Sequence, residues 1–162
     1  TVWGPGMNPH YVKFLNMVKN GKYFHVGYKD YMKSYSYVGN FCYQLEELAN
    51  LPCEKIHKKT FYLADFEPIS LHQWAESFRT EFNAPKIRSI PLSIMQVVST
   101  LGSFLTTLGI NFPINRFRLK NMITEYVYDL SEVYNIIPDL PYSYNDGIKE
   151  TAEWFLNQNN RS

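Results

Sequence analysis

The chain has 162 residues, 45% of them apolar, so it can bury one ordinary hydrophobic core and corresponds to one domain or a large piece of one. Sixteen basic and fifteen acidic residues give a net charge of +1, which excludes the strongly basic surface typical of a nucleic-acid-binding protein. The four histidines and two cysteines form neither a His-Glu-x-x-His nor a Cys-x-x-Cys motif, so the sequence predicts no metal site and no redox motif.

The start of the chain predicts a processed protein. The first residue is threonine rather than methionine, and no charged-then-apolar signal segment follows, so we expect a mature or truncated product. Cys42 and Cys53 are expected to be reduced thiols, as is usual in a cytoplasmic protein.

The N-terminal part predicts a strand end, a helix and a second strand. Thr1 to Pro9 is a short apolar entry that turns at Gly4-Pro5-Gly6, and without a third glycine this turn is a weak signal for a dinucleotide-binding loop. A helix is predicted from Pro9 to a cap at Asn20-Gly21, followed by a strand from Tyr23 to Val26.

An alternating segment runs directly into an amphipathic one at Val38-Gly39-Asn40. Serines and tyrosines alternate in Ser34 to Val38, which predicts a half-buried strand. After Asn40, a good N-cap residue, apolar residues recur at helical spacing up to Pro52, namely Phe41, Leu45, Leu48 and Leu51. Strand-to-helix junctions face the ligand crevice in α/β folds, so Asn40 is either a functional candidate or a simple N-cap.

The second half of the chain predicts further strands and helices. Ser70 and Gln73 form a capping box that opens a helix ending near Phe82. The other predicted elements are a charged loop at 54–59, a buried strand at 60–64, a short strand at 87–90, and helices at 91–108, from 131 to a stop at 137–138, and at 145–157, the last capped by Ser143.

Residues 89–115 form the longest stretch without a charged side chain, so a membrane span has to be considered. Serine, threonine and glutamine recur there every three or four residues, which places a polar stripe beside an apolar one and argues against a span. We expect a packed helix, a dimer contact or a membrane-surface contact, in that order of preference.

Basic residues stand in two places that an anionic ligand can reach. Lys33 precedes the alternating strand, at the same end as the junction loop. Arg116, Arg118 and Lys120 alternate with two apolar residues, a pattern that fits a solvated strand face slightly better than an anion clamp.

Five segments, in one order along the chain, together resemble one protein family. They are VWGPG at 2–6, a helix ending in NG at 20–21, SYSYVGN at 34–40, FYLAD at 61–65, and YDLS followed by IIPDLPYSYNDGIKETAEWF between 128 and 155. The chain resembles the C-terminal half of the NAD-dependent epimerase/dehydratase family, the extended short-chain dehydrogenases/reductases. The resemblance implies an α/β fold, the C-terminal part of a Rossmann-type protein with mixed helices and short strands, lacking the N-terminal dinucleotide-binding half.

The resemblance also implies two interleaved parts within this chain. Residues 1–4, 38–51 and 61–82 would belong to the Rossmann sheet layer, and residues 5–37 and 85–162 to the substrate-binding domain. NAD or NADP would be bound mainly by the missing half, which in the family carries the glycine-rich loop and the catalytic Tyr-x-x-x-Lys pair. No tyrosine of this chain has a lysine four residues on, so no catalytic residue is expected here and the chain alone is expected to be inactive.

Site residues follow from the resemblance, position by position. Lys33 stands where the family often has an arginine that contacts a substrate phosphate, and Arg118, with Lys120 as its neighbour, matches a basic residue of nucleotide-sugar enzymes. A lysine is a point charge rather than a bidentate fork, so Lys33 would orient a phosphate less strictly. The other expected contacts are Tyr23 and His25 in the substrate pocket, and Thr1, Val2 and Trp3 at the edge of the nicotinamide site.

The implied activity is hydride transfer between NAD(P) and a nucleotide sugar, by a parent epimerase, dehydratase or reductase. The Val38-Gly39-Asn40 junction and the proline-led apolar helix also resemble the 3β-hydroxysteroid dehydrogenase-like and dihydroflavonol reductase-like branches, in which residues 92–108 would line an apolar pocket. A non-catalytic binding or scaffold protein of the same fold is the remaining alternative. A homodimer is a possible assembly, and neither nucleic acid nor a membrane span is expected.

Overall fold

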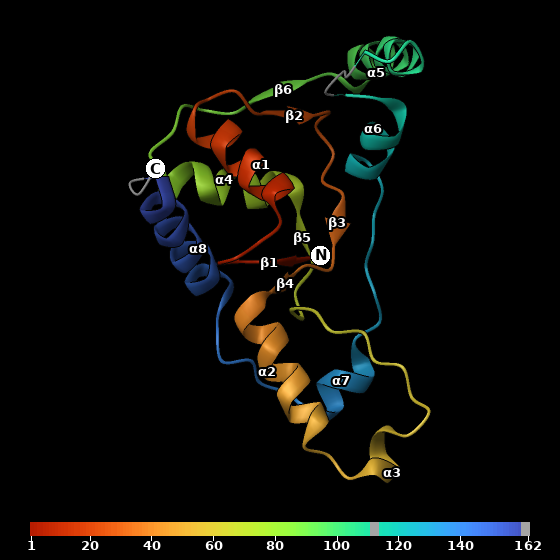
Figure 1. Ribbon diagram of the computed structural model, residues 1–162, viewed down its shortest axis with the longest axis vertical. Helices are drawn as coiled ribbons and strands as arrows, with labels where there is room; N and C mark the ends of the chain where they lie inside the picture. The colour runs from red at the N-terminus through yellow and green to blue at the C-terminus, as the bar shows by residue number, and fades with distance from the viewer. Residues whose placement is uncertain (111–113, 160–162) are drawn as a thin grey trace.

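The computed structural model describes residues 1–110 and 114–159, which form helices joined by short strands (Figure 1). The strands are β1 (Val2–Trp3), β2 (Phe24–Val26), β3 (Met32–Lys33), β4 (Ser36–Tyr37), β5 (Ile69–Ser70) and β6 (Arg88–Ile90). The helices are α1 (Pro9–Lys19), α2 (Val38–Ala49), α3 (Cys53–Ile56), α4 (Leu71–Glu81), α5 (Leu92–Thr107), α6 (Arg116–Met122), α7 (Ser131–Ile136) and α8 (Tyr144–Asn159). The predicted fold class, mixed helices with short strands, is confirmed.

The strands pair across long stretches of sequence. β1 lies parallel to β4, with Trp3 opposite Tyr37, and β2 lies parallel to β6. β3 and β5 are antiparallel, with Lys33 opposite Ile69. Parallel pairing of strands that are separated by helices is the connection expected of an α/β fold.

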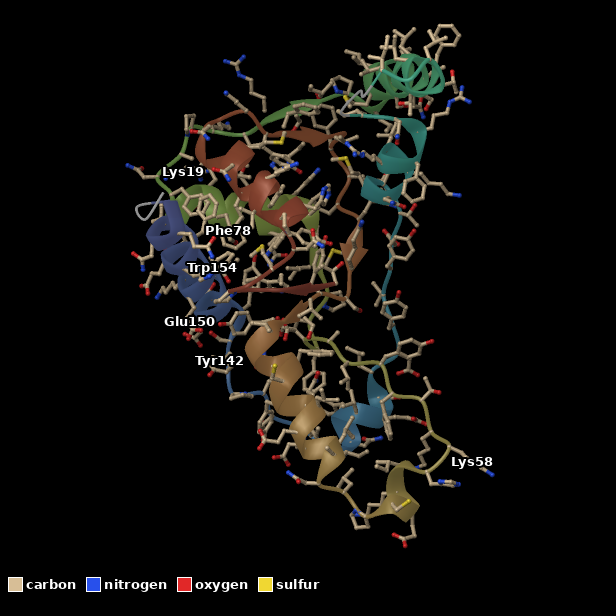
Figure 2. The ribbon with its side chains drawn as sticks, viewed as in Figure 1. Lys19, Lys58, Phe78, Tyr142, Glu150 and Trp154 are labelled. Atoms are coloured by element: carbon tan, nitrogen blue, oxygen red, sulfur yellow. The ribbon has the colours of Figure 1, made fainter. Side chains whose placement is uncertain are left out.

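Aromatic side chains form much of the main core, where α1, α4 and α8 meet. The ring of Trp74 stacks on those of Phe14 and Tyr35, with centroids 4.9 Å and 5.5 Å away, and meets Trp3 edge to face. Phe78, one turn later on α4, is buried in the same core, on the side where α4 meets α8 (Figure 2). Burial of these large rings holds the helices against the strand pairs.

A smaller core joins α2 to α7, at the opposite end of the molecule from α5 (Figure 1). Leu48 of α2 packs there with Val133 and Ile137, and all three side chains are buried. The predicted short helix from Ser131, which stops near Ile137, is thereby confirmed.

Helix ends that depend on local capping agree with the sequence prediction. α1 begins at Pro9, and the chain after it adopts a φ of +65° at Gly21, a conformation that favours glycine. The Ser70 hydroxyl accepts a hydrogen bond from the backbone N–H of Gln73 at 3.0 Å and so caps α4. The predicted strands near 23–26 and 87–90 are likewise present, as β2 and β6.

Asn40 is not the N-cap that the sequence predicted. Tyr37 occupies the N-cap of α2, and Asn40 lies buried in the first turn. Its Nδ2 donates to the Asp65 carboxylate at 2.8 Å and to the Tyr142 carbonyl at 3.0 Å, and its Oδ1 accepts from the Tyr142 N–H at 3.1 Å. The amide therefore ties α2 to two segments far away in the sequence, as a buried polar group requires.

The buried faces of β4 and α2 also differ from the prediction. Ser36 and Tyr37 are both buried, so β4 is not half-exposed. On α2, Gln44 faces inward and Leu45 is exposed. The Nε2 of Gln44 donates to the Ala64 carbonyl at 3.1 Å, so an amide occupies the face that the periodicity assigned to leucines.

Residues 60–64 form no strand, contrary to the prediction. Ala64 is buried, but Tyr62 is exposed, and no strand in the described ranges pairs with this segment. A short apolar run becomes a strand only where a neighbour satisfies its backbone groups. The stretch 54–59 is also not entirely a loop, because α3 extends over Cys53–Ile56.

The long helix predicted after Pro91 is confirmed as α5. No helix within residues 1–110 and 114–159 combines the length and the apolar character that a membrane crossing requires. Residues 111–113 and 160–162, which fall in the predicted substrate-binding part at 85–162, lie outside the described residues.

Candidate functional site

A small cavity lies between the segment around β2, the start of α4 and the end of α6. It is lined by Tyr23, Val26, Lys29, Tyr31, Leu71, His72 and Met122. Its volume of about 10 Å³ is enough for one water molecule. Residues from three distant parts of the sequence therefore meet here, among them Tyr23, one of the predicted site residues.

Tyr23 presents a buried hydroxyl at this cavity. The hydroxyl has no hydrogen-bond partner among the described residues, and the ring packs edge to face on Phe14 and His25. Burial raises the pKa of the Tyr23 phenol, with a smaller contribution from Tyr35, so it stays protonated at neutral pH. A water molecule or a polar ligand atom in the cavity would satisfy this group.

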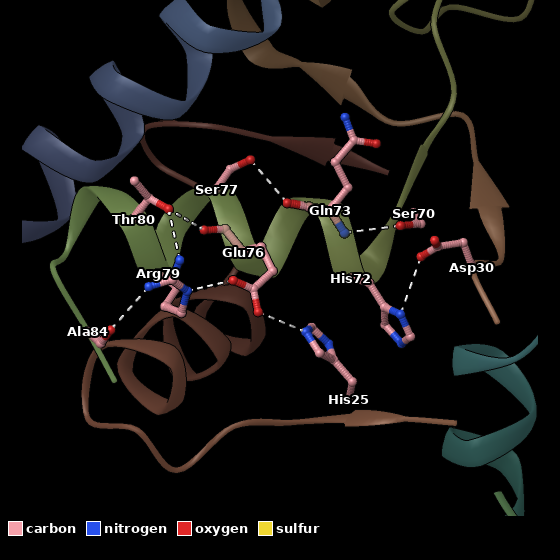
Figure 3. Close-up of polar contacts among 10 residues, drawn as sticks. All are labelled: His25, Asp30, Ser70, His72, Gln73, Glu76, Ser77, Arg79, Thr80 and Ala84. Carbon is pink, nitrogen blue, oxygen red and sulfur yellow. Dashed lines mark hydrogen bonds and ion pairs between the residues drawn. The ribbon is translucent and has the colours of Figure 1, made fainter. Parts of the chain in front are cut away.

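Two histidines and two carboxylates form a polar cluster beside the cavity (Figure 3). The rings of His25 on β2 and His72 on α4 have centroids 4.2 Å apart. The Nε2 of His25 lies 3.3 Å from a Glu76 oxygen, and the Nδ1 of His72 lies 3.3 Å from an Asp30 oxygen. No group of three or more metal-ligating side chains with a geometry suited to a metal ion is present within residues 1–110 and 114–159.

His25 is held in its neutral form. Burial lowers the pKa of its imidazole, and this outweighs the opposing hydrogen bond from Glu76. The Nε of Arg79 donates to the other carboxylate oxygen of Glu76 at 2.5 Å (Figure 3). The Arg79 guanidinium therefore supplies the positive charge beside Glu76, and a protonated His25 is not needed for it. The cluster therefore suits a neutral histidine at physiological pH.

We expect the stability of the fold to fall as the pH drops below about 6.5, the ordinary pKa of histidine. The pKa of His25 in the folded protein is lowered below this ordinary value, which applies to the unfolded chain. Between the unfolded-state pKa and the folded-state pKa the unfolded chain binds more protons, so stability is lost as the pH falls toward and through the folded-state pKa. The slope from one proton reaches at most about 1.4 kcal/mol per pH unit. Urea unfolding of His25→Gln at pH 5, 6 and 7 should show a shallower slope than the parent protein. His10→Gln, at an exposed position on α1, should leave the slope unchanged.

Lys33 connects β3 to α6. Its Nζ donates to the Asn121 carbonyl at 2.5 Å and lies 5.4 Å from the centre of the Tyr126 ring. Asn121 directly precedes Met122, one of the residues that line the cavity. Burial lowers the pKa of the Lys33 ammonium group, so an anion placed next to it would favour the charged form.

The three basic residues at 116–120 lie on a helix, not on the strand that was slightly favoured. The Asn115 side chain caps α6 by accepting from the Arg118 N–H at 2.9 Å. Side chains two residues apart point to different sides of a helix, so Arg116, Arg118 and Lys120 form no common clamp. Arg118 instead shares a face with Met122, four residues on, which is the side of α6 that meets the cavity.

Arg116 and Lys120 face a separate groove between α5 and α6. The groove has a volume of about 290 Å³ and is lined by Gln96, Ser99, Thr100, Arg116, Leu119, Lys120 and Ile123. The Nε of Arg116 donates to the Thr100 hydroxyl at 3.3 Å. The side of α5 that lines this groove is polar, through Gln96, Ser99 and Thr100.

The expected nicotinamide-edge residues differ in exposure. Trp3 is buried in the main core, where its ring packs on Tyr37 and Trp74. Thr1 and Val2 are exposed, and the Thr1 hydroxyl lies 3.3 Å from that of Tyr11. Of the three, only Thr1 and Val2 present side chains that a cofactor can reach.

Several residues of the polar cluster were not selected from the sequence. Asp30 stands in a polar loop, and His72 and Glu76 lie on the helix that the capping box predicted. No motif or spacing links these positions to His25, because they meet only through the β2–β6 and β3–β5 pairs. The loop position of Asp30, next to a predicted strand end, was the one local signal for it.

No family model and no curated protein matches this sequence. Among solved structures, the chain is similar to the human epimerase family protein SDR39U1, crystallised with NADPH, at 13% identity and a TM-score of 0.67, over 94% of this chain and 45% of that one. It is also similar to UDP-glucose 4-epimerase of Thermotoga maritima, solved with UDP-glucose, at 14% identity and a TM-score of 0.65, over 98% and 44% of the two chains. A third similar structure is the UDP-glucuronic acid 4-epimerase of Bacillus cereus in complex with NAD, at 10% identity and a TM-score of 0.66, over 98% of this chain and 43% of that one.

The chain therefore spans less than half the length of these solved structures while nearly all of it is matched. At identities of 10–14%, the likeness establishes the fold. The chain has the fold of the C-terminal portion of the NAD-dependent epimerases and dehydratases, the extended short-chain dehydrogenases/reductases.

Proposed function

We propose that this chain supplies the substrate-binding side of an NAD(P)-dependent epimerase, dehydratase or related oxidoreductase that acts on a nucleotide sugar. The observation that carries the proposal is the match of 94–98% of the chain to the corresponding part of such enzymes. The similar proteins were solved with NADPH, NAD or UDP-glucose, which supports the same cofactor and substrate classes here.

Basic residues next to the segments that line the cavity support a diphosphate-bearing substrate. Lys33 lies half-buried between β3 and α6, two residues after Tyr31, and Arg118 lies on α6 one turn before Met122. Together they would neutralise the diphosphate, while the Tyr23 hydroxyl and the neutral His25 lie next to the same space. Lys120 would extend this basic surface into the α5–α6 groove.

The rest of the enzyme would supply the cofactor-binding half and the catalytic residues. Residues 1–4, 38–51 and 61–82 would pack with a cofactor-binding half, and 5–37 and 85–162 would form the substrate side. Nicotinamide, when bound, would accept and return the hydride, with Thr1 and Val2 near its edge. Without the Tyr-x-x-x-Lys pair, which this sequence lacks, the chain by itself would bind substrate but not convert it.

Calorimetric titration of the full-length protein with UDP tests this proposal. We expect UDP to bind at least about tenfold more tightly than uridine, because the diphosphate supplies the charge that the basic residues neutralise. Equal affinities for UDP and uridine, or no binding of either, would contradict it.

A further inference from the structure

One face of α5 exposes a continuous row of large apolar side chains. Its members recur every three or four residues and are each more than half exposed: Ile94, Val97, Leu101, Phe104 and Leu108. Phe117, at the start of the neighbouring α6, is also largely exposed. α5 lies at the outer edge of the molecule, far from the α2–α7 lobe (Figure 1). Contiguous exposed apolar surface of this kind marks a site of interaction.

The orientation of α5 is fixed by its polar side. Ser99 is buried, and the Ser103 hydroxyl accepts a hydrogen bond from the Arg116 N–H at 3.0 Å. The polar stripe thus packs toward α6, and the apolar stripe points outward, the reverse of an ordinary surface helix. The apolar row is therefore exposed because the opposite, polar side of α5 packs against α6.

The charged residues of the segment that contains α5 have one sign. The segment 82–124 contains five basic residues and no acidic residue, leaving eleven basic and fifteen acidic residues in the rest of the chain. All five cationic side chains are exposed: Lys86, Arg88, Arg116, Arg118 and Lys120. An exposed apolar row in a segment whose charged side chains are all cationic is complementary to a layer that is apolar inside and anionic at its surface.

We propose that α5, with the basic residues of β6 and α6, docks on an anionic lipid surface. The apolar row would enter the boundary of the acyl chains, and the cations would lie at the headgroups. α5 has sixteen residues and a length of about 24 Å, shorter than the hydrocarbon core of about 30 Å, so it lies on the membrane rather than across it. A second copy of this chain fits the face less well, because five cations on each copy would repel.

Vesicle co-sedimentation of the full-length protein tests the docking surface. Binding is expected to vesicles of phosphatidylcholine with about 30% phosphatidylserine, to be much weaker on phosphatidylcholine alone, and to decline in about 0.5 M NaCl. Leu101→Ser/Phe104→Ser should weaken binding at least about tenfold, because both side chains would leave the acyl boundary. Arg88→Glu should weaken it about fivefold through charge alone.

Matched controls carry the same chemical changes elsewhere. Leu45→Ser changes an exposed leucine on α2, and Lys58→Glu changes a lysine at the opposite end of the molecule from α5 (Figure 2), so both should bind as the parent does. Absence of binding to anionic vesicles, or equal losses in the controls, would overturn the proposal. A lipid-free dimer that the α5 double variant dissociates would overturn it too, by identifying a second copy as the occupant. None of these outcomes depends on UDP binding.

Discussion

Replacing Asn40 by alanine is expected to destabilise the fold by about 3 kcal/mol. The change removes hydrogen bonds that the buried Asn40 side chain makes to the Asp65 carboxylate and to both backbone groups of Tyr142. Asp65 keeps only the Tyr37 N–H at 2.9 Å among its described partners. A half-buried carboxylate that loses a hydrogen-bond donor is destabilised, so the loss of stability should exceed that from replacing an ordinary surface asparagine.

Chemical denaturation at neutral pH measures this loss, with Asn50→Ala as the matched control. Asn50 caps the other end of α2 and is exposed, so its replacement should change the free energy of unfolding by less than about 0.5 kcal/mol. Burial already raises the pKa of Asp65, and loss of the Asn40 donor would raise it further. The deficit of Asn40→Ala should therefore shrink as the pH falls and Asp65 becomes protonated. Equal effects of the two substitutions would contradict the account.

Lys33→Ala is expected to weaken UDP binding by about tenfold or more, which is the second large effect. A charge-assisted hydrogen bond to phosphate contributes about 1.5–3 kcal/mol, and contacts with Asn121 and Tyr126 position the Lys33 ammonium group. Lys33→Arg keeps the charge and should recover part of the affinity. Calorimetric titration with UDP measures both variants.

The control for Lys33 is Lys13→Ala, an exposed lysine on α1 that should leave the affinity unchanged. Unfolding midpoints of the three variants separate loss of binding from loss of the fold, since Lys33 also bonds the Asn121 carbonyl. An affinity of folded Lys33→Ala equal to that of the parent would remove Lys33 from the proposed site.

Features set by neighbouring residues were predictable from the sequence. Pro9 at a helix start, Ser70 with its bond to Gln73, and Gly21 with its positive φ act within a few residues, and the structure contains all three. The helices that start at Pro9 and Ser70 followed from these local signals, whereas the fold class followed from the family resemblance.

Features set by distant partners were not predictable. Asn40 has the sequence signature of a cap, but Asp65 and Tyr142 lie 25 and 102 positions away and decide its role. The 60–64 segment has an apolar strand pattern but no strand partner in the described part of the chain. Residues 116–120 alternate as a strand would, yet the Asn115 cap turns them into α6.

The candidate site likewise contains residues that were selected from the sequence and residues that were missed. Lys33 was selected through the family resemblance, and Tyr23 and His25 because they lie next to the loop that leads to Lys33. In the structure Tyr23 lines the cavity and its ring packs edge to face on that of His25, while Lys33 bonds α6. His72 was missed because its approach to His25 depends on the packing of α4 against β2, a contact that no sequence spacing encodes.

Hydrogen–deuterium exchange of the full-length protein, with and without saturating UDP, tests the central claim most directly. A substrate side built around β2, β3 and α6 predicts slower exchange of the amides at 23–33 and 116–126, with α2 and α7 unchanged. Protection confined to α2 and α7, or no protection anywhere in this chain at saturating UDP, would contradict it.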